Sequence, residues 1–443
     1  MAKKENRHAE HFDKLSASLV SASANIEAPY ELPEGWKWEK ISNLSDIYTG
    51  NSINETVKKE KYTGIKEGLN FIGTKDVDFD GTINYENGVK ISDYENFKTV
   101  PANTPLLCIE GGSAGKKLGI TSEQVCFGNK LCAFVCKNVE PKLVYYYLQT
   151  NAFFYSFIKE RHGLIGGVSV GTLKNIPFPL PPTLAEQQRI VNRIETMFAK
   201  LDEAKEKAQN VVASFETRKA AILHKAFNGQ LKIDNEELSI EDWEVRELDV
   251  DFDIVSGIQK TPSRVPKNNP VPYLTVANVF RDRIDLSEVR YFEVSDAEVE
   301  KLKLIEKDIL VVEGNGSGNE IGRCAMWRNE IPVCVHQNHI IRLRKKNDSV
   351  LPEYVLLYLN SSEGKAIMKE KAKTTAGLYN LSAGKIKTIS VPYPPLNYQL
   401  SIVNFLDIVL EKESRAKEAA QTVLDQIALL KKSILARAFR GEL

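Results

Sequence analysis

Hydrophobic residues recur every three or four positions in two long segments of the chain, residues 190–222 and 402–434. The first series is Ile190, Ile194, Met197, Leu201, Ala204, Ala208, Val211, Phe215, Arg218 and Ile222. The second is Ile402, Leu406, Val409, Glu413, Ala416, Ala420, Val423, Ile427, Leu430 and Ile434. Steps that alternate between four and three form a coiled-coil seam, which only Arg218 and Glu413 interrupt. The pattern predicts two helices of about 40 residues, each roughly 60 Å long.

The two predicted helices are copies of one another. Residues 190–231 run from IVNRIE to AFNGQL, and residues 402–443 run from IVNFLD to AFRGEL, at a constant offset of 212 without a gap. Because the helices are copies and the chain must return from one to the other, we expect them to pair antiparallel. The small side chains would then lie at the crossing, with Ala204 facing Ala420 and Ala208 facing Ala416.

The segments before each helix are also repeated, but with less regular spacing. Trp36 and Gly50 match Trp243 and Gly257 at an offset of 207, whereas EGGSAG (110–115) matches EGNGSG (313–318) at 203. Loops on a surface tolerate insertions that a rigid helix does not, so the two modules have diverged while the helices kept one length. Internal repetition with such a long period indicates a tandem duplication of a large unit.

The alternation of polar and apolar residues makes each module mixed α/β. The runs PLLCIE, KLCAFVC, DILVVE and HIIRLR predict strands, and residues 142–160 and 352–372 have helical spacing. The proline-rich stretches PFPLPP and VPYPPL end the modules. The predicted organisation is an N-terminal extension (1–29, helical or disordered), module 1 (30–182), a central helix (183–231), module 2 (232–395) and a C-terminal helix (396–443).

Composition restricts the possible functions. Lys plus Arg and Asp plus Glu both number 59, so any nucleic-acid surface must be local. The chain has no apolar run long enough for a membrane span and no signal-peptide core near its start, so we expect a cytoplasmic protein without membrane contact. The six cysteines form no CxxC pair and are expected to be core thiols. His336 and His339 lack accompanying ligands, so no metal or cofactor is predicted.

The sequence contains no complete catalytic motif. GGSAGKK (111–117) resembles a phosphate-binding loop, but Glu110 stands at the first required glycine and Lys117 replaces the hydroxyl residue. NNPVPY (268–273) resembles an adenine-methyltransferase motif but separates its two prolines, and no glycine-rich cofactor motif accompanies it. We therefore expect no catalytic residues in this chain.

Candidate binding residues lie in loops that occupy matching places in both modules. Such loops either bring backbone and small polar side chains close to a ligand or only connect two strands tightly. The glycine loops supply Ser113, Lys116 and Lys117, and Asn315, Ser317 and Asn319. A second loop near the end of each module, residues 158–174 in module 1 and 371–387 in module 2, is called the later loop. The later loops supply Arg161, His162 and Lys174, and Lys373, Thr374, Thr375 and Lys385. Weaker candidates are Asn51, Ser52 and Lys75 in module 1, and Gln259, Lys260 and Asn278 in module 2.

The chain resembles the DNA-specificity subunits of Type I restriction–modification systems. The residues that carry the resemblance are LPEGWKW, the two glycine loops, NIPFPLPPTLAEQQRIV, and the helix ends AILHKAFNGQL and SILARAFRGEL, over about residues 30–443. The second helix departs from it by beginning LNYQLSIV, so its polar surface differs.

The resemblance implies a non-catalytic subunit with two target-recognition domains, which read the two halves of a split site in double-stranded DNA. It further implies that the helices set the half-site spacing and bind two methyltransferase subunits, with motor/nuclease subunits in the full complex. The fold expected is two tandem α/β domains, separated and joined by two long antiparallel coiled-coil helices with pseudo-twofold symmetry. The alternative from the residues alone is a coiled-coil scaffold whose duplicated modules bind proteins.

Overall fold

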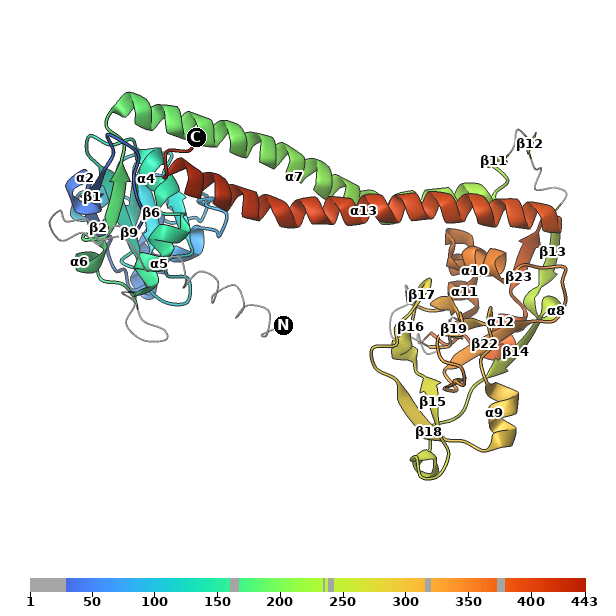
Figure 1. Ribbon diagram of the computed structural model, residues 1–443. Coiled ribbons are helices and arrows are strands. Elements are labelled where there is room, and N and C mark those ends of the chain that lie inside the picture. The colour runs from blue at the N-terminus through green and yellow to red at the C-terminus, as the bar shows by residue number, and fades with distance from the viewer. Residues whose placement is uncertain (1–28, 160–166, 234–235, 238–242, 315–319, 373–378) are drawn as a thin grey trace. The chain divides into compact units, whose positions relative to one another are not determined.

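A computed structural model of the chain describes residues 29–159, 167–233, 236–237, 243–314, 320–372 and 379–443 (Figure 1). These residues divide into two compact units. Unit 1 comprises Met1–Lys207 with Thr422–Leu443, and unit 2 comprises Ala208–Gln421. Each unit therefore joins one module to parts of both long helices, α7 (Leu184–Phe227) and α13 (Leu396–Ala438).

The described residues of unit 1 form ten strands and five helices before α7. The strands are β1 Lys37–Lys40, β2 Ser45–Thr49, β3 Leu69–Ile72, β4 Lys90–Ile91, β5 Thr99–Val100, β6 Pro105–Cys108, β7 Leu118–Ile120, β8 Val125–Phe127, β9 Leu131–Cys136 and β10 Pro177–Leu180. The helices are α2 Ile41–Leu44, α3 Glu55–Val57, α4 Pro141–Tyr147, α5 Asn151–Lys159 and α6 Val170–Leu173. Short turns of helix are η1 Lys58–Tyr62, η2 Thr74–Asp76 and η3 Tyr94–Asn96.

Three layers make up module 1. A four-stranded sheet in the order β2-β9-β6-β7 lies between α4 and α5 on one face and a second sheet, β4-β3-β8-β5, on the other. Alternation along the strands produces these two faces. Leu107 and Phe134 pack toward the helices, and Leu106 and Ala133 pack toward the second sheet.

Unit 2 repeats this architecture. Its strands are β11 Lys232–Ile233, β12 Glu236–Glu237, β13 Glu244–Glu247, β14 Phe252–Ser256, β15 Pro270–Leu274, β16 Val279–Phe280, β17 Arg283–Ile284, β18 Arg290–Glu293, β19 Ile309–Val312, β20 Cys324–Met326, β21 Val335–His336, β22 Ile340–Lys345 and β23 Ser390–Tyr393. Its helices are α8 Leu248–Asp251, α9 Asp296–Leu302, α10 Pro352–Asn360, α11 Ser362–Ala372 and α12 Ala383–Lys387, with turns η5 Pro262–Arg264 and η6 Val276–Asn278. The sheet β14-β22-β19-β20 corresponds to β2-β9-β6-β7, and β18-β15-β21 corresponds to β4-β3-β8.

The four strands predicted from apolar runs are confirmed as β6, β9, β19 and β22. Each predicted helix of the modules is two helices, because a hydroxyl residue starts a new one. The hydroxyl of Thr150 accepts a hydrogen bond from the Phe153 amide (3.1 Å), and the hydroxyl of Ser361 accepts one from the Gly364 amide (3.1 Å).

A buried glutamine fixes the start of each long helix. The side-chain oxygen of Gln187 accepts a hydrogen bond from the Glu140 amide (2.9 Å), and that of Gln399 accepts one from the Leu351 amide (3.0 Å). Both side chains are almost fully buried, at 3% and 1% exposure. The two residues match at the constant offset of the repeat, so this identity reflects a structural role that the sequence did not reveal.

The antiparallel pairing of α7 and α13 follows from the composition of the units. The beginning of α7 shares unit 1 with the end of α13, and the end of α7 shares unit 2 with the beginning of α13. Within unit 1, Lys431 pairs with Asp202 (2.6 Å), and within unit 2, Arg218 pairs with Glu413 (2.8 Å). The two residues that interrupt the predicted seams are therefore partners.

The predicted register and the second seam need correction. Ala416 is exposed rather than packed on Ala208, and the Arg218–Glu413 pair places the register about one heptad away from the predicted one. Val423 and Leu430 are also exposed, at 39% and 47%. The other predicted pair, Ala204 and Ala420, depends on the same register and is withdrawn with it.

Next to two of the exposed positions, Ala416 and Leu430, the following residue of α13 is a lysine that packs on a ring of α7. The Lys417 ammonium lies 4.3 Å from the Phe215 ring centre, and Lys431 lies 4.9 Å from that of Phe198. A long aliphatic stem covers apolar surface while its charged end stays in water, and the cation is attracted to the ring. A hydrophobic pattern does not count such lysines as seam residues, which explains the error.

Candidate nucleic-acid interface

Four strands of module 1 end at the same border of the fold. The loops that follow β2, β3, β6 and β8 are residues 50–52, 73–76, 109–117 and 128–130, and we call these four loops edge 1. The Asn51 amide donates to the Phe127 carbonyl oxygen (2.9 Å), and the Gly128 amide donates to that of Ile72 (2.9 Å). These bonds link loops that are far apart in sequence into one surface.

The same four loops meet in module 2. They follow β14, β15, β19 and β21 as residues 257–260, 275–278, 313–314 and 337–339, and we call them edge 2. The Ile258 amide donates to the His336 carbonyl oxygen (2.8 Å), as Asn51 does to Phe127. The Gln337 amide donates to Leu274 (2.9 Å), as Gly128 does to Ile72. The two edges therefore share one backbone hydrogen-bond pattern.

A glycine is required where the first two loops touch. A Cβ atom on Gly50 would lie 1.9 Å from the carbonyl oxygen of Phe127, and one on Gly257 would lie 2.0 Å from that of His336. Any larger residue would force these backbones apart. The glycine matched in both modules is thus explained by close packing at each edge.

A cation ties the glycine loop to the neighbouring turn in both modules. The Lys117 ammonium donates to the Thr74 carbonyl oxygen (3.1 Å) and lies 5.1 Å from the Phe79 ring centre. In module 2, the Arg323 guanidinium donates to the Val276 carbonyl oxygen (3.1 Å). Lys117, a predicted phosphate contact, therefore also holds edge 1 together.

Most of the candidates in module 1 lie on edge 1. Ser52, Lys75 and Lys116 are exposed, and neither lysine forms an ion pair with a described residue. Ser113 is partly exposed in the glycine loop. Asn51 is half-buried, and its side-chain oxygen accepts a hydrogen bond from the Lys98 amide (2.8 Å), so part of its hydrogen-bonding capacity is used within the fold.

In the described part of the later loop of module 1, residues 167–174, the first three residues lie at edge 1. The Val168 amide donates to the Ile109 carbonyl oxygen (3.0 Å), and residues 167–169 line a polar pocket with Glu110 and Lys130. Lys174 is exposed, but its carbonyl oxygen accepts from the Ser42 amide (3.4 Å), before the start of β2. Lys174 therefore lies away from the end of β2 where the candidates gather.

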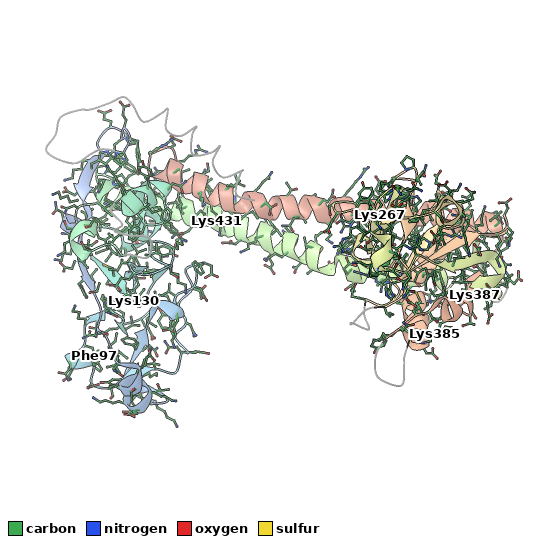
Figure 2. All side chains as sticks on the ribbon, turned by 90° about the horizontal axis from the view of Figure 1, so that it is seen from below. Phe97, Lys130, Lys267, Lys385, Lys387 and Lys431 are labelled. Atoms are coloured by element: carbon green, nitrogen blue, oxygen red, sulfur yellow. The ribbon has the colours of Figure 1, made fainter. Side chains whose placement is uncertain are left out.

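Three of the four candidates in the described part of module 2 are accessible. Gln259 and Lys260 are exposed in the first loop of edge 2. Lys385, labelled in Figure 2, donates to the Asn380 carbonyl oxygen (2.9 Å), and Asn380 forms a β-bridge with Gly314 of edge 2. Asn380 thus lies beside the glycine loop of module 2, as Val168 does in module 1.

Asn278 is not available to a ligand. It is 4% exposed, and its side-chain oxygen accepts from the amide and the hydroxyl of Thr275, both at 2.8 Å. Its side-chain nitrogen donates to the carbonyl oxygens of Asp285 (2.8 Å) and Glu288 (2.9 Å). Because every hydrogen-bonding position of the amide is filled, Asn278 has a structural role and is removed from the proposed contacts.

Eight candidates lie outside the described residues, and their roles remain predictions. They are Arg161, His162, Asn315, Ser317, Asn319, Lys373, Thr374 and Thr375.

Sequence reasoning missed the turn after β8 and its counterpart after β21. Asn129 and Lys130 occupy the turn in edge 1, and Figure 2 labels Lys130. Asn338 and His339 occupy the turn in edge 2. The signal was the alignment of FGNKL (127–131) with HQNHI (336–340), in which polar residues interrupt two buried strands. A polar turn between strands is so common that this signal alone did not indicate function.

No group of three or more His, Cys, Asp and Glu side chains within the described ranges is placed to hold a metal ion. His336 is fully buried, with its Nδ1 at 2.9 Å from the Ile340 carbonyl oxygen, and burial lowers its pKa to about 4. Burial raises the pKa of Cys132 to about 12, as expected for a core thiol.

No helix in the described ranges is long and apolar enough to cross a membrane.

Comparisons with known proteins support this description. The family model of the Type I restriction modification DNA specificity domain matches residues 33–213 and again residues 240–422. The specificity subunit of the Type I restriction enzyme EcoKI from Escherichia coli K12 is 26% identical over 440 residues, covering 93% of this chain and 90% of that protein. The StySPI specificity subunit from Salmonella potsdam is 25% identical over 436 residues, with 93% and 90% covered.

Solved structures show the same fold. A chain from a type I R-M system, described in terms of complex assembly and conformational transition, has a TM-score of 0.69 at 16% identity, covering 94% of this chain and all of that one. The HsdS subunit from Thermoanaerobacter tengcongensis has a TM-score of 0.66 at 18% identity, with 94% and 100% covered. Since the family model matches both repeats and most of the sequence, the chain belongs to the family of Type I restriction–modification DNA specificity subunits.

Proposed function

We propose that this subunit reads a bipartite, asymmetric site in double-stranded DNA, with one half-site at each edge. The observation that carries the proposal is the repeated edge: two modules share one backbone arrangement but present different side chains. Lys75 and Lys116 on edge 1 suit phosphates, and Gln259 and Lys260 on edge 2 combine an amide with a cation. One backbone with unlike side chains is suited to reading two unlike half-sites.

We further propose that two methyltransferase subunits bind the long helices. Several residues are identical at matching positions of α7 and α13 although both copies are exposed, where burial does not constrain the residue type. These pairs are Asn192 and Asn404, Lys200 and Lys412, Glu206 and Glu418, and Gln209 and Gln421. Two copies of one partner would each need the same surface, which this repetition provides.

Charge reversal tests this surface. Glu206→Lys and Glu418→Lys should each reduce the number of bound methyltransferase subunits from two to one, measured by native mass spectrometry of the co-expressed complex. Glu203→Lys is the matched control, because Glu203 is exposed on the same helix but its counterpart is Arg415. Retention of two subunits by both repeat-position variants would contradict the proposed surface.

The helices are proposed to set the spacing of the half-sites. α7 is a continuous helix of 44 residues, which spans roughly 66 Å at 1.5 Å per residue. Inserting four residues, about one helical turn, into α7 should change the spacer or abolish methylation. Unchanged target spacing with full activity would refute this role.

The zero net charge is compatible with DNA binding if the partners supply much of the phosphate contact, which dominates affinity. Binding by the isolated subunit should then be weak and sensitive to salt. The assembled complex would methylate adenine at N6 in the cytoplasm and, with motor/nuclease subunits, cleave DNA.

The direct test is to co-express the subunit with its methyltransferase and map methylated bases across a genome by sequencing. The expected result is one bipartite asymmetric motif. Gel shifts with and without the methyltransferase provide the second readout, with sequence-dependent binding strongest in the complex. A protein scaffold would give neither a motif nor a sequence-dependent shift.

A further inference from the structure

A two-residue turn lies at the centre of each edge. In edge 1 the turn holds Asn129 and Lys130, and it is closed by the Leu131 amide, which donates to the Gly128 carbonyl oxygen (3.1 Å). In edge 2 it holds Asn338 and His339, and it is closed by the Ile340 amide, which donates to Gln337 (2.8 Å). Asparagine thus occupies the first of the two central positions of the same β-turn in both modules.

Neighbouring loops fix the backbone of these turns on several sides. Next to the Gly128 bond to Ile72 described above, the Lys130 carbonyl oxygen accepts from the Ile109 amide (3.0 Å). In edge 2, the His339 carbonyl oxygen accepts from the Glu313 amide (2.9 Å), and the Asn338 amide donates to Ile258 (2.9 Å). A side chain on such a turn projects from a defined position, as specific recognition requires.

The asparagine side chains are accessible, and the fold makes little use of their amides. Asn129 is exposed, and its side chain makes no hydrogen bond to a described residue. Asn338 is half-buried, and its only such partner within the described ranges is the His339 ring, at 3.5 Å. This contrasts with Asn278, whose amide is filled by four bonds.

We propose that Asn129 and Asn338 each read one base pair in the major groove, with adenine as the preferred base. The inference rests on the proposed function of the edges. A carboxamide accepts a hydrogen bond from adenine N6 and donates one to N7, a pairing that no other base edge offers. The residue beside each asparagine differs, Lys130 in one module and His339 in the other, so the strength of the phosphate contact next to each base should differ as well.

Serine variants test the inference, because serine also favours turns and preserves the loop. Asn129→Ser in the complex with methyltransferase should lose about 10- to 100-fold discrimination at one A·T position of one half-site. Asn338→Ser should do the same at one position of the other half-site. Motifs mapped by sequencing methylated DNA give both readouts, and the unaltered half-site in each variant controls for folding.

Two further variants sharpen the test. Asn129→Asp also favours a turn but only accepts hydrogen bonds, so preference at the same position should change from adenine toward cytosine, whose N4 donates. Lys130→Ser should weaken binding to all sequences and leave the motif unchanged. These opposite signatures separate base readout from phosphate contact within one turn.

An unchanged motif in Asn129→Ser, Asn129→Asp and Asn338→Ser, with wild-type methylation, would overturn the inference. That outcome would leave the proposed function intact, because the wild-type complex would still methylate a defined motif. A wild-type complex without any motif would instead contradict the proposed function itself.

Discussion

The two edges share their backbone and differ in the side chains that they present. Gly50 and Gly257 make the same close contact with a neighbouring backbone. The amide of the next residue, Asn51 or Ile258, donates a hydrogen bond to the carbonyl oxygen of the last residue of β8 or β21. Yet Ser52 on edge 1 is replaced by Gln259 on edge 2, and Lys130 is replaced by His339; all four side chains are exposed. Backbone hydrogen bonds and two glycines maintain the surface, which leaves its side chains free to change specificity.

Substituting the glycine of one edge should have the largest effect on this comparison. The added Cβ of Gly50→Ala meets backbone that cannot move cheaply, so we expect more than about 3 kcal/mol of destabilisation in unit 1. Recognition of one half-site should be lost, and Gly257→Ala should remove the other. Differential scanning calorimetry and methylation assays measure both effects.

Gly112→Ala is the matched control for these variants. Gly112 lies in the glycine loop of the same edge, but an added Cβ has no atom within 4 Å. Stability and methylation should stay near wild type. Equal damage by Gly50→Ala and Gly112→Ala would contradict the close-packing explanation.

Acid should destabilise unit 2 through His336. Burial lowers the pKa of His336 to about 4, whereas an unfolded histidine titrates near 6.5. Between these values the unfolded chain binds a proton that the folded chain excludes, so stability falls as pH decreases from about 6.5 to 4. The total loss is about 3 kcal/mol at 1.36 kcal/mol per pKa unit.

Replacing His336 with the residue of the other module checks this pH dependence. Nε2 of His336 is buried without a hydrogen-bond partner among the described residues, so His336→Phe loses only the bond of Nδ1 to the Ile340 carbonyl oxygen and should flatten the acid slope in urea unfolding. Module 1, with Phe127 at this position, provides the comparison. An unchanged slope in His336→Phe would assign the acid sensitivity elsewhere.

Edge lysines should contribute to affinity without affecting sequence preference. Lys75→Ala and Lys116→Ala should each reduce the slope of log K against log salt by about 1, because each removes one phosphate contact. Lys174→Ala, away from edge 1, should leave the slope unchanged. Fluorescence anisotropy with the assembled complex at several salt concentrations measures this, and an effect confined to Lys174→Ala would place the interface elsewhere.

The smallest effect on stability is expected from the ion pair between Arg218 of α7 and Glu413 of α13. Arg218 and Glu413 keep 35% and 24% of their side chains exposed, so water weakens their attraction. A double-mutant cycle with Arg218→Gln and Glu413→Gln should give a coupling of about 0.5–1 kcal/mol. No measurable coupling would mean that the pair does not fix the register.

The sequence predicted the features that hydrophobic spacing controls directly. The strands β6, β9, β19 and β22 and the seam of α7 needed only their apolar residues. Most predicted positions of the α13 seam are buried or half-buried, but Ala416, Val423 and Leu430 were misassigned. Next to two of them, Lys417 and Lys431 pack their stems on phenylalanine rings, and a hydrophobic pattern counts lysine as polar.

The site was harder to predict than the fold. Loop composition located parts of both edges, but Asn278 and Asn129 are both polar residues in short turns after strands. Only their hydrogen-bond partners distinguish the buried asparagine from the accessible one. Such partners come from segments distant in sequence, which spacing along the chain does not reveal.

Photocrosslinking tests the central claim most directly. A crosslinking amino acid replaces Lys116 on edge 1, Lys260 on edge 2, or Lys174 as the control, in the complex with methyltransferase bound to its DNA site. Crosslinks from position 116 should map to one half-site, those from position 260 to the other, and position 174 should give few. Crosslinking of positions 116 and 260 to the same half-site, or stronger crosslinking from position 174, would contradict recognition by two separate edges.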